Sequence, residues 1–304
     1  MISSDQTLRD AVLRSMERAL LGDGQASEFT DGTSVRDLIA DELATEFTSG
    51  ERTTLRSMDE VGGRALALAR AGQFELADGQ YRNAASMLND RELNPAARSL
   101  AESVLAAQRA YRAHRSGDDA TARTLLELAV RRDLELEARH GYAVLRIHRM
   151  QLLGNVLRIY ANRGVWKMAL AIGVSVLAYL ERFDERVLRN LPDPWGQCWE
   201  GRVPALERRA GPIHARLSRQ TIRTLTTTGV SFSADEFGAV LEAVGLNDPT
   251  TQVSNWCEFQ AAHFRRRTDD RLSAAIVSLD RGPVPSAPLW RQIVEWALTF
   301  LGLG

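Results

Sequence analysis

A spacing of glycine and small or apolar residues occurs three times in this chain. In each copy a glycine is followed at +2, +5, +9 and +12 by residues that are mostly small or apolar. Steps of three and four place these positions on one face of a helix, and the glycine stands where a preceding helix has to end. The pattern therefore predicts three helical hairpins, each folded about its glycine. The three copies are Gly72, Phe74, Ala77, Tyr81, Ala84; Gly117, Asp119, Ala122, Leu126, Ala129; and Gly164, Trp166, Ala169, Gly173, Val176.

The hinge glycines are regularly spaced along the chain. Positions 72, 117 and 164 lie 45 and 47 residues apart, and a near-constant period is typical of helical repeat arrays. One hairpin cannot bury its own apolar face, so each hairpin needs its neighbours. We therefore expect a stack of hairpins built to hold a partner. The alternative is generic antiparallel helix packing, in which glycine turns and small contact residues recur by chance.

The first copy resembles a known repeat family. The run Gly-x-aromatic-x-x-Ala-x-x-x-aromatic-x-x-Ala from Gly72 to Ala84 is similar to the second half of a tetratricopeptide repeat. The other copies depart from it, because Asp119 replaces the aromatic residue, Gly173 a large residue and Val176 the final alanine. The period of about 46 residues also exceeds that of the standard repeat, so the helices must be longer. The resemblance implies an all-α fold of antiparallel hairpins, stacked as a tetratricopeptide-like α-solenoid.

The resemblance also implies a groove for a partner. In tetratricopeptide arrays the first helix of each hairpin lines a concave groove, and the family's groove positions can be carried over to this sequence. The version of the family that binds a carboxylate needs lysine and asparagine there, and both are missing. We therefore expect a protein or peptide ligand with an apolar side chain. The alternative is that these residues only pack helix against helix. The partner residues are Asp59, Leu66, Tyr111, His114, Gln151 and Arg158.

The chain divides into three expected regions. Residues 1–50 carry two amphipathic helical patterns that we expect to cap the stack, residues 51–190 hold the repeats, and residues 191–304 form a C-terminal helical region. Proline, glycine and tryptophan cluster between Leu191 and Gly211 and mark the last boundary. No alternating strand pattern of useful length is present, so the sequence predicts an all-α protein.

Composition and charge exclude several functions. The formal net charge of −1 gives no global attraction to nucleic acid or anionic membrane. No run reaches the ~20 apolar residues of a membrane-spanning helix, and the first residues lack the apolar core of a signal peptide. Lys167 is the only lysine, which is typical of a GC-rich coding sequence. These features predict a cytoplasmic, bacterial protein without a membrane span.

No catalytic or metal centre stands out in the sequence. No two of the five histidines are three or four residues apart, and His148 lies beside Arg146 and Arg149, a positive setting that disfavours metal. Neither Cys198 nor Cys257 has a Cys-x-x-Cys partner, and no Gly-x-Ser-x-Gly elbow is present. We therefore expect no metal, no cofactor and no catalytic residue.

The sequence thus favours a non-enzymatic adaptor or regulatory subunit that binds a protein or peptide in the groove of the repeats. One alternative is a transcriptional regulator, because residues 233–267 loosely resemble a helix-turn-helix. The side chains of its second helix that are suited to reading base edges are Thr250, Thr251, Gln252, Ser254 and Asn255. An arginine run after this helix would contact phosphates. That run is Arg265, Arg266 and Arg267. Its structural alternative is a solvated polar helix face. A less favoured alternative is a helical enzyme with a site at the junction around Trp195–Trp199.

The C-terminal stretch 288–301 is strongly apolar. It carries Trp290 and Trp296 and is too short to span a membrane. We expect it either to close the fold as a last helix or to form the contact of a homo-oligomer, since two exposed tryptophans would be costly.

Overall fold

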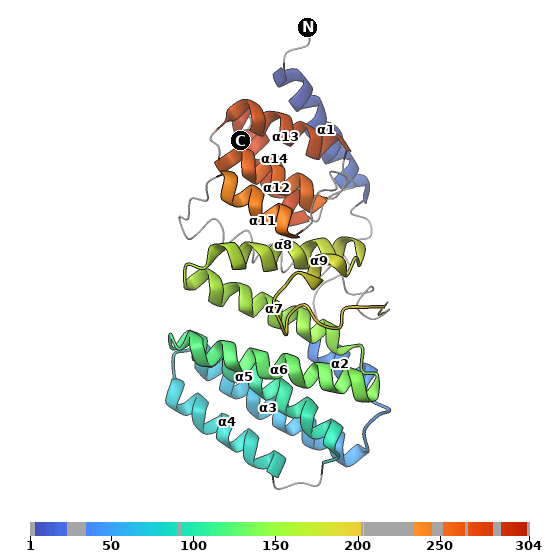
Figure 1. Cartoon of the computed structure of the whole chain (residues 1–304), viewed down its shortest axis with the longest axis vertical. Helices are drawn as coiled ribbons and strands as arrows, with labels where there is room; N and C mark the ends of the chain where they lie inside the picture. The colour runs from blue at the N-terminus through green and yellow to red at the C-terminus, as the bar shows by residue number, and fades with distance from the viewer. Residues whose placement is uncertain are drawn as a thin grey trace. The chain divides into compact units, whose positions relative to one another are not determined.

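The chain is all-α over the residues that its computed structural model describes (Figure 1). Thirteen helices and no β-strand occur within these residues, in agreement with the sequence prediction. No helix among them is both long enough and apolar enough to cross a membrane. The described residues are 4–22, 35–89, 93–201, 203, 234–244, 252–264, 267–281 and 287–302.

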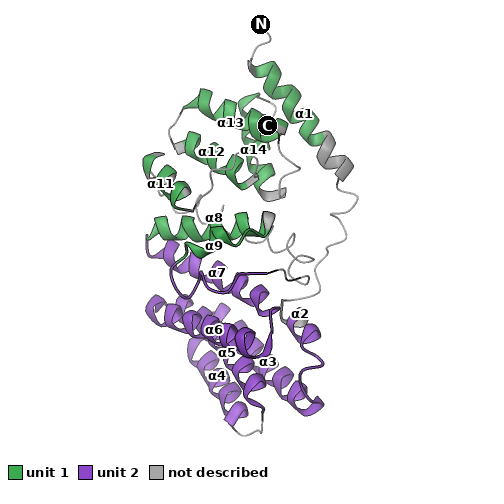
Figure 2. Cartoon of the chain, turned by 45° about the vertical axis from the view of Figure 1, so that its right-hand side comes forward, with its two compact units in different colours: residues 1–31, 165–191, 207–304 green, residues 32–164, 192–206 purple. Residues whose placement is uncertain are grey.

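The helices belong to two compact units, and each unit is built from separate stretches of the chain (Figure 2). Unit 1 takes residues 1–31, 165–191 and 207–304, and unit 2 takes residues 32–164 and 192–206.

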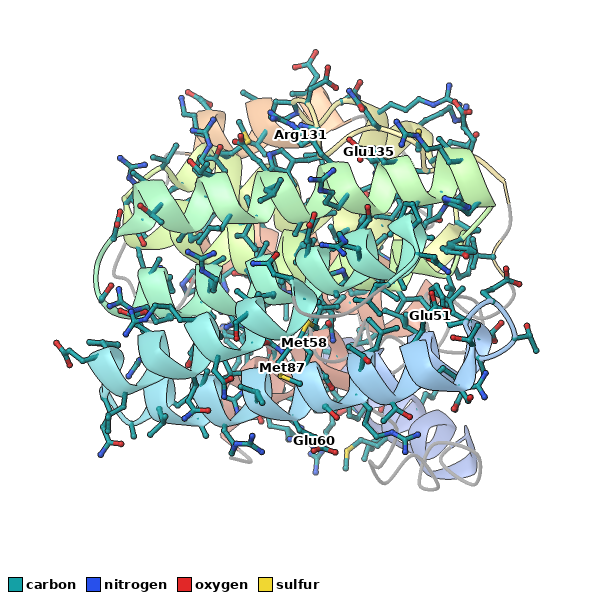
Figure 3. All side chains as sticks on the ribbon, turned by 90° about the horizontal axis from the view of Figure 1, so that it is seen from below. Glu51, Met58, Glu60, Met87, Arg131 and Glu135 are labelled. Atoms are coloured by element: carbon teal, nitrogen blue, oxygen red, sulfur yellow. The ribbon has the colours of Figure 1, made fainter. Side chains whose placement is uncertain are left out.

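Unit 2 contains the first two hairpins. α3 packs against α4 and α5, and α5 packs against α6, so that two antiparallel pairs lie side by side. α7 packs mainly on α6, has few contacts with α5, and also receives α2. Met58 is buried where α3 faces α4, whereas Glu60 points to solvent (Figure 3). The helices are α2 (Val35–Glu42), α3 (Ser49–Arg70), α4 (Phe74–Asn89), α5 (Pro95–Arg115), α6 (Asp119–His140) and α7 (Leu145–Asn162).

The hinge glycines behave as the spacing predicted. Gly72, Gly117 and Gly164 have φ of 76°, 85° and 73°, in the left-handed region that ends a helix and that glycine adopts without strain. The +5, +9 and +12 positions of all three copies are buried. The local part of the pattern is therefore confirmed: a helix ends at each glycine, and the small and apolar positions after it form a buried face. At Gly72 and Gly117 the two flanking helices also pack on each other as a hairpin.

One carboxylate joins the starts of α3 and α5. Glu51 completes a capping box with Thr48, whose backbone N–H donates to Oε2 at 2.8 Å. Its Oε1 accepts the backbone N–H of Asn94, the N-cap of α5, at 2.9 Å. These hydrogen bonds, the one from Asn94 first, hold the pKa of Glu51 below its ordinary value. Glu51 therefore fixes the beginning of one hairpin relative to the next.

Unit 1 buries its core between α1 and the last three helices. Leu8, Ala11 and Val12 of α1 lie in one apolar cluster with residues of α12, α13 and α14. Trp290 donates to Ser15, and Arg14 pairs with an aspartate of α13 at 2.7 Å. The helices are α1 (Ser4–Gly22), α8 (Trp166–Arg182), α9 (Arg186–Arg189), α11 (Ala234–Val244), α12 (Gln252–Phe264), α13 (Thr268–Arg281) and α14 (Ala287–Phe300).

The two units do not follow the three expected regions. Residues 1–50 do not form one cap, because α1 packs on α13 and α14 in unit 1 whereas α2 packs on α7 in unit 2. The repeat region 51–190 is divided at Gly164, since α8 belongs to unit 1. Residues 192–206 of the expected C-terminal region belong to unit 2. The physical reason is burial: each segment joins the apolar surface that its own apolar face complements, irrespective of chain order.

Candidate functional site

The six predicted partner residues lie on α3, α5 and α7 of unit 2. All six side chains are half-buried, so that they are neither core residues nor free surface residues. Asp59 and Leu66 lie on α3, Tyr111 and His114 on α5, and Gln151 and Arg158 on α7.

Contacts between α3 and α5 bring the first of these residues together. Gln108 of α5 reaches Asp59 across the interface, with Nε2 at 3.5 Å from Oδ1. A Cβ on Gly62 would stand 2.0 Å from Oε1 of Gln108, so the two helices approach closely because this position has no side chain. Further along, the guanidinium of Arg70 lies 5.8 Å from the ring centre of Tyr111. Asp59 and Tyr111 are thus partly buried in the packing of α3 on α5 and partly exposed to solvent.

A second set of contacts links α5 to α7. Asn162 Nδ2 lies 3.1 Å from Nε2 of His114 and donates to it, which leaves Nδ1 to donate to Asp119 at 2.6 Å. Asp119 stands at the +2 position, where the first copy has Phe74 under a guanidinium instead. At the first hinge the +2 residue makes a cation–π contact, between Arg112 and Phe74. At the second hinge the +2 residue instead accepts a hydrogen bond, from His114 to Asp119.

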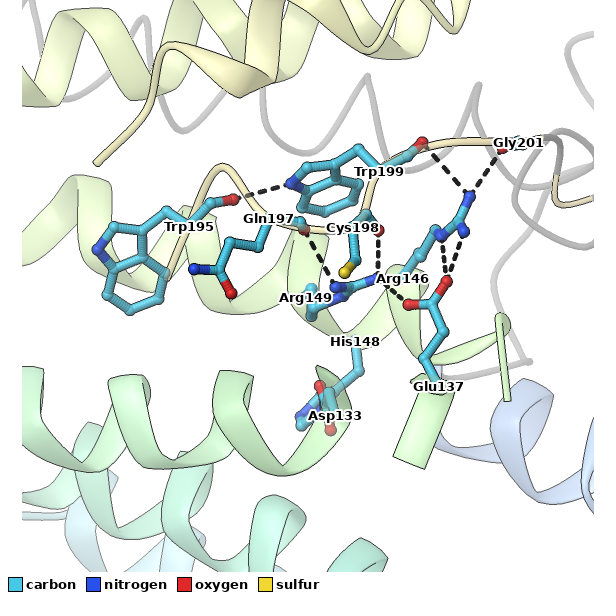
Figure 4. Close-up of polar contacts among 10 residues, drawn as sticks. All are labelled: Asp133, Glu137, Arg146, His148, Arg149, Trp195, Gln197, Cys198, Trp199 and Gly201. Atoms are coloured by element: carbon cyan, nitrogen blue, oxygen red, sulfur yellow. Dashed lines mark hydrogen bonds and ion pairs between the residues drawn. The ribbon is translucent and has the colours of Figure 1, made fainter. Parts of the chain in front are cut away.

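A buried polar cluster that the sequence analysis missed lies between α5, α6 and α7 (Figure 4). Asp133 is fully buried; Ser103 Oγ lies 2.6 Å from its Oδ1, and His148 Nδ1 lies 2.9 Å from its Oδ2. In a nucleophilic triad the imidazole stands between hydroxyl and carboxylate. Here the carboxylate stands between hydroxyl and imidazole, and Ser103 is fully buried. This order ties three helices together and does not activate the serine.

A second carboxylate orders two arginines that hold residues 195–201, which we call the strap. Glu137 pairs with Arg146 and with Arg149, and Arg149 is almost fully buried. Burial lowers the pKa of Arg149, against the opposite effect of Glu137. The two guanidinium groups donate to backbone carbonyls of the strap, at 2.7 Å to Gly201 and 2.9 Å to Cys198 (Figure 4). The charged side chains of the cluster therefore hold the strap by its backbone carbonyls. These contacts depend on the positions of the guanidinium donors and not on the identity of the strap side chains.

The strap tryptophans are part of this packing. Trp195 and Trp199 are both 2% exposed. Trp199 Nε1 donates to the Trp195 carbonyl at 2.8 Å, and the guanidinium of Arg149 lies 4.9 Å from a ring centre of Trp199. Their side chains fill the interior of unit 2, which gives the hypothesis of an enzyme site at Trp195–Trp199 no support.

Two signals in the sequence could have indicated the cluster. Asp133 and Glu137 are four residues apart, which places them on one face of α6. Arg146, His148 and Arg149 fall among apolar residues at the start of α7, where a buried charge has to find a partner. The sequence analysis interpreted these cations only as a setting that disfavours metal. Among the described residues, no group of three His, Cys, Asp or Glu side chains could hold a metal ion.

No family model, curated protein or solved structure is detectably similar to this chain.

The helix-turn-helix hypothesis requires two polar residues of α12 to be exposed, but the structure buries them. Ser254 and Asn255 of α12 would have to face base edges, but they are 6% and 3% exposed within unit 1. Arg267 is exposed and pairs with Asp270 at 3.4 Å. Arg265, Arg266 and the turn 245–251 lie outside the described residues. A recognition helix has to expose its polar face to the groove of DNA, and α12 buries these two members of that face.

The expected C-terminal contact is formed inside unit 1. Leu289, Ile293 and Ala297 of α14 are buried, and the last two share the cluster with Leu8 of α1. Trp290 and Trp296 are only half-exposed. The stretch 288–301 therefore packs as the closing helix of unit 1, which is one of its two expected roles. The expected contact of a homo-oligomer stays a prediction.

Proposed function

We propose that this chain is a non-enzymatic adaptor or regulatory subunit that binds a protein or peptide on the surface formed by α3, α5 and α7. The observation that supports the proposal is the placement of the six partner residues. They lie half-buried on three helices of one unit, and contacts link α3 to α5 (Arg70–Tyr111) and α5 to α7 (His114–Asn162).

A tetratricopeptide-like arrangement is part of this proposal. Its support is the order of packing in unit 2, where each hairpin closes on itself and the first helix of the second hairpin packs on the first helix of the first. α7 departs from that order, because it packs on α6 rather than on α5. The buried cluster of Asp133 and Glu137 lies where α6 and α7 meet. The regular packing order therefore covers α3 and α5, and we place the most regular part of the ligand surface there.

The chemistry of this surface suits an extended peptide. Leu66 and Tyr111 offer apolar area, and the guanidinium group of Arg70 lies beside the ring of Tyr111. An aromatic ring next to arginine is the composition that dominates binding energy at protein interfaces. We expect a ligand with one apolar side chain flanked by carboxylates or backbone carbonyls.

A cytoplasmic location also belongs to the proposal. Both cysteines are free thiols, one exposed and one buried. Free thiols are usual in a reducing compartment.

The experiment is selection of phage-displayed random peptides on the full chain, followed by affinity measurement on two double variants. Tyr111→Ala with Arg158→Ala is expected to weaken selected peptides by about tenfold or more. The matched control, Leu76→Ala with Arg82→Ala, removes an exposed apolar and an exposed arginine side chain from α4 and should leave the affinity unchanged.

Thermal unfolding of both variants shows whether they keep the fold. Equal affinity of the two folded variants for the selected peptides would refute the proposed binding surface. A loss of affinity in the α4 variant alone would show that the peptides bind at α4 instead.

A further inference from the structure

An arginine of unit 1 is held between aromatic rings. Arg271 lies on α13, and its guanidinium carbon stands 4.3 Å from a ring centre of Trp296 on α14 and 5.2 Å from that of Phe259 on α12. These three helices pack on one another. Stacking on two rings fixes the plane of the guanidinium group and so prearranges its donors.

This guanidinium has no counter-ion among the described residues. Asp270, its neighbour in sequence, pairs with Arg267 instead. Nε of Arg271 is buried without a hydrogen-bond partner, and the side chain as a whole is half-buried. Burial lowers the pKa of Arg271, with no opposing carboxylate. Burial, and after it the positive charge of Arg271, lowers the pKa of the nearby His263. A partly desolvated cation of this kind is incompletely compensated.

An exposed aromatic ring stacks on the tryptophan that contacts the cation. Trp296 stacks on Phe300 with ring centres 5.4 Å apart, and Phe300 is 39% exposed. The terminal nitrogens of Arg271 are the part of its side chain left to reach a ligand, because Nε is enclosed. The cationic fork thus comes from α13 and the exposed apolar ring from α14, two helices that pack on each other. Figure 1 shows these two helices.

We propose that Arg271, Trp296 and Phe300 form an oxyanion-binding site whose ligand carries a carboxylate or phosphate attached to an aromatic or apolar group. The fork geometry of guanidinium matches both anions. The ring of Phe300 supplies the apolar contact that a bare inorganic ion would not use. This site lies in unit 1 and is independent of the peptide surface proposed for unit 2.

A structural role makes a different prediction. If Arg271 served only to cover Trp296 and Phe259 with its aliphatic stem, as long cationic side chains do, an anion would not change its environment. The Nε–H group distinguishes the two roles, because it is an enclosed reporter at the centre of the site.

The experiment follows the Arg Nε–Hε signals of the full chain by NMR, with the Arg271 signal identified from its loss in Arg271→Lys. Benzoate, phenyl phosphate and inorganic phosphate are the probes. We expect a saturable shift of the Arg271 signal with the two aromatic anions and at least about tenfold weaker binding of inorganic phosphate. Comparison of benzoate with phenyl phosphate then tells whether the natural anion is a carboxylate or a phosphate.

Two variants test the assignment. Arg271→Lys keeps the charge but not the fork and should weaken the tighter aromatic anion about tenfold, measured by calorimetry. Arg267→Met removes an exposed neighbouring charge and should leave that affinity within about twofold. Unshifted Nε–Hε signals with every probe, or equal weakening in both variants, would overturn the proposal, since the first indicates a structural cover and the second a general charge effect.

Discussion

At the scale of single residues, backbone conformation distinguishes glycines that look alike in the sequence. Gly117 adopts φ of 85° at the end of α5, and no atom lies within 4 Å of the position a Cβ would take. A side chain there would suffer only the strain of the left-handed region. Gly79 lies inside α4, where its nearest neighbour is the far end of Arg82 at 3.9 Å. Neither site is crowded, so the two sites differ in the conformation of the backbone.

The two alanine substitutions should have opposite signs. Gly117→Ala is expected to lower the free energy of unfolding by about 1 kcal/mol, because alanine is strained at positive φ. Gly79→Ala is expected to raise it by about 0.5–1 kcal/mol, because glycine loses more backbone entropy than alanine in a helix. Urea unfolding followed by circular dichroism measures both. A destabilisation of the same size at both sites would contradict the hinge assignment.

At the scale of elements, Glu51 joins two helix starts through one carboxylate, and its ionised form makes the contacts. Because the folded-state pKa lies below the ordinary 4.5, the unfolded chain binds more protons over the interval between the two values. The stabilisation is therefore complete above that ordinary value and is lost as the pH falls through the folded-state pKa.

Glu51→Gln should lower the free energy of unfolding by about 1–2 kcal/mol at neutral pH, since it weakens two backbone hydrogen bonds. The difference from the natural chain should shrink as the pH falls below about 4. Denaturant titrations at a series of pH values measure it. Glu60→Gln, an exposed glutamate of the same helix, is the control and should show no such dependence. A difference that stays constant with pH would count against the role of the ionised carboxylate.

Local elements of this fold could be predicted, and distant pairings could not. The turn at Gly72 and the burial of Ala77 and Tyr81 depend on residues a few positions apart, so spacing alone indicates them. The pairing of Arg149 with Glu137, and its bonds to the strap, joins segments far apart in sequence that no periodicity connects. The six partner residues were placed on the expected helices, but their side-chain partners depend on how α5 and α7 meet.

At the scale of the whole molecule, α1 packs within unit 1, so we expect it to stabilise unit 1 and not unit 2. Leu8 is fully buried in the cluster with α12, α13 and α14, whereas Leu13 on the same helix is 53% exposed. The loss of a buried leucine leaves a cavity as well as lost contacts.

Leu8→Ala should destabilise unit 1 by about 2–5 kcal/mol. Hydrogen exchange read by mass spectrometry should show faster exchange in α12, α13 and α14, and unchanged exchange in α3 to α6. Leu13→Ala is the matched control and should change little. If the helices of unit 2 lost protection to the same extent, the two units would unfold as one, and the division of the chain would have no energetic meaning.

The placement of α1 also sets an order of events during synthesis. Leu8 and Phe259 of the same cluster are 251 positions apart, so at about 5–20 residues per second the ribosome needs roughly 10–50 s to deliver the last three helices of that cluster. The hairpin of α3 and α4 is completed by neighbouring residues within a few seconds on the same scale. During that interval the apolar stripe of Leu8, Ala11 and Val12 has no native surface to cover it, so α1 is open to non-native contacts while translation continues.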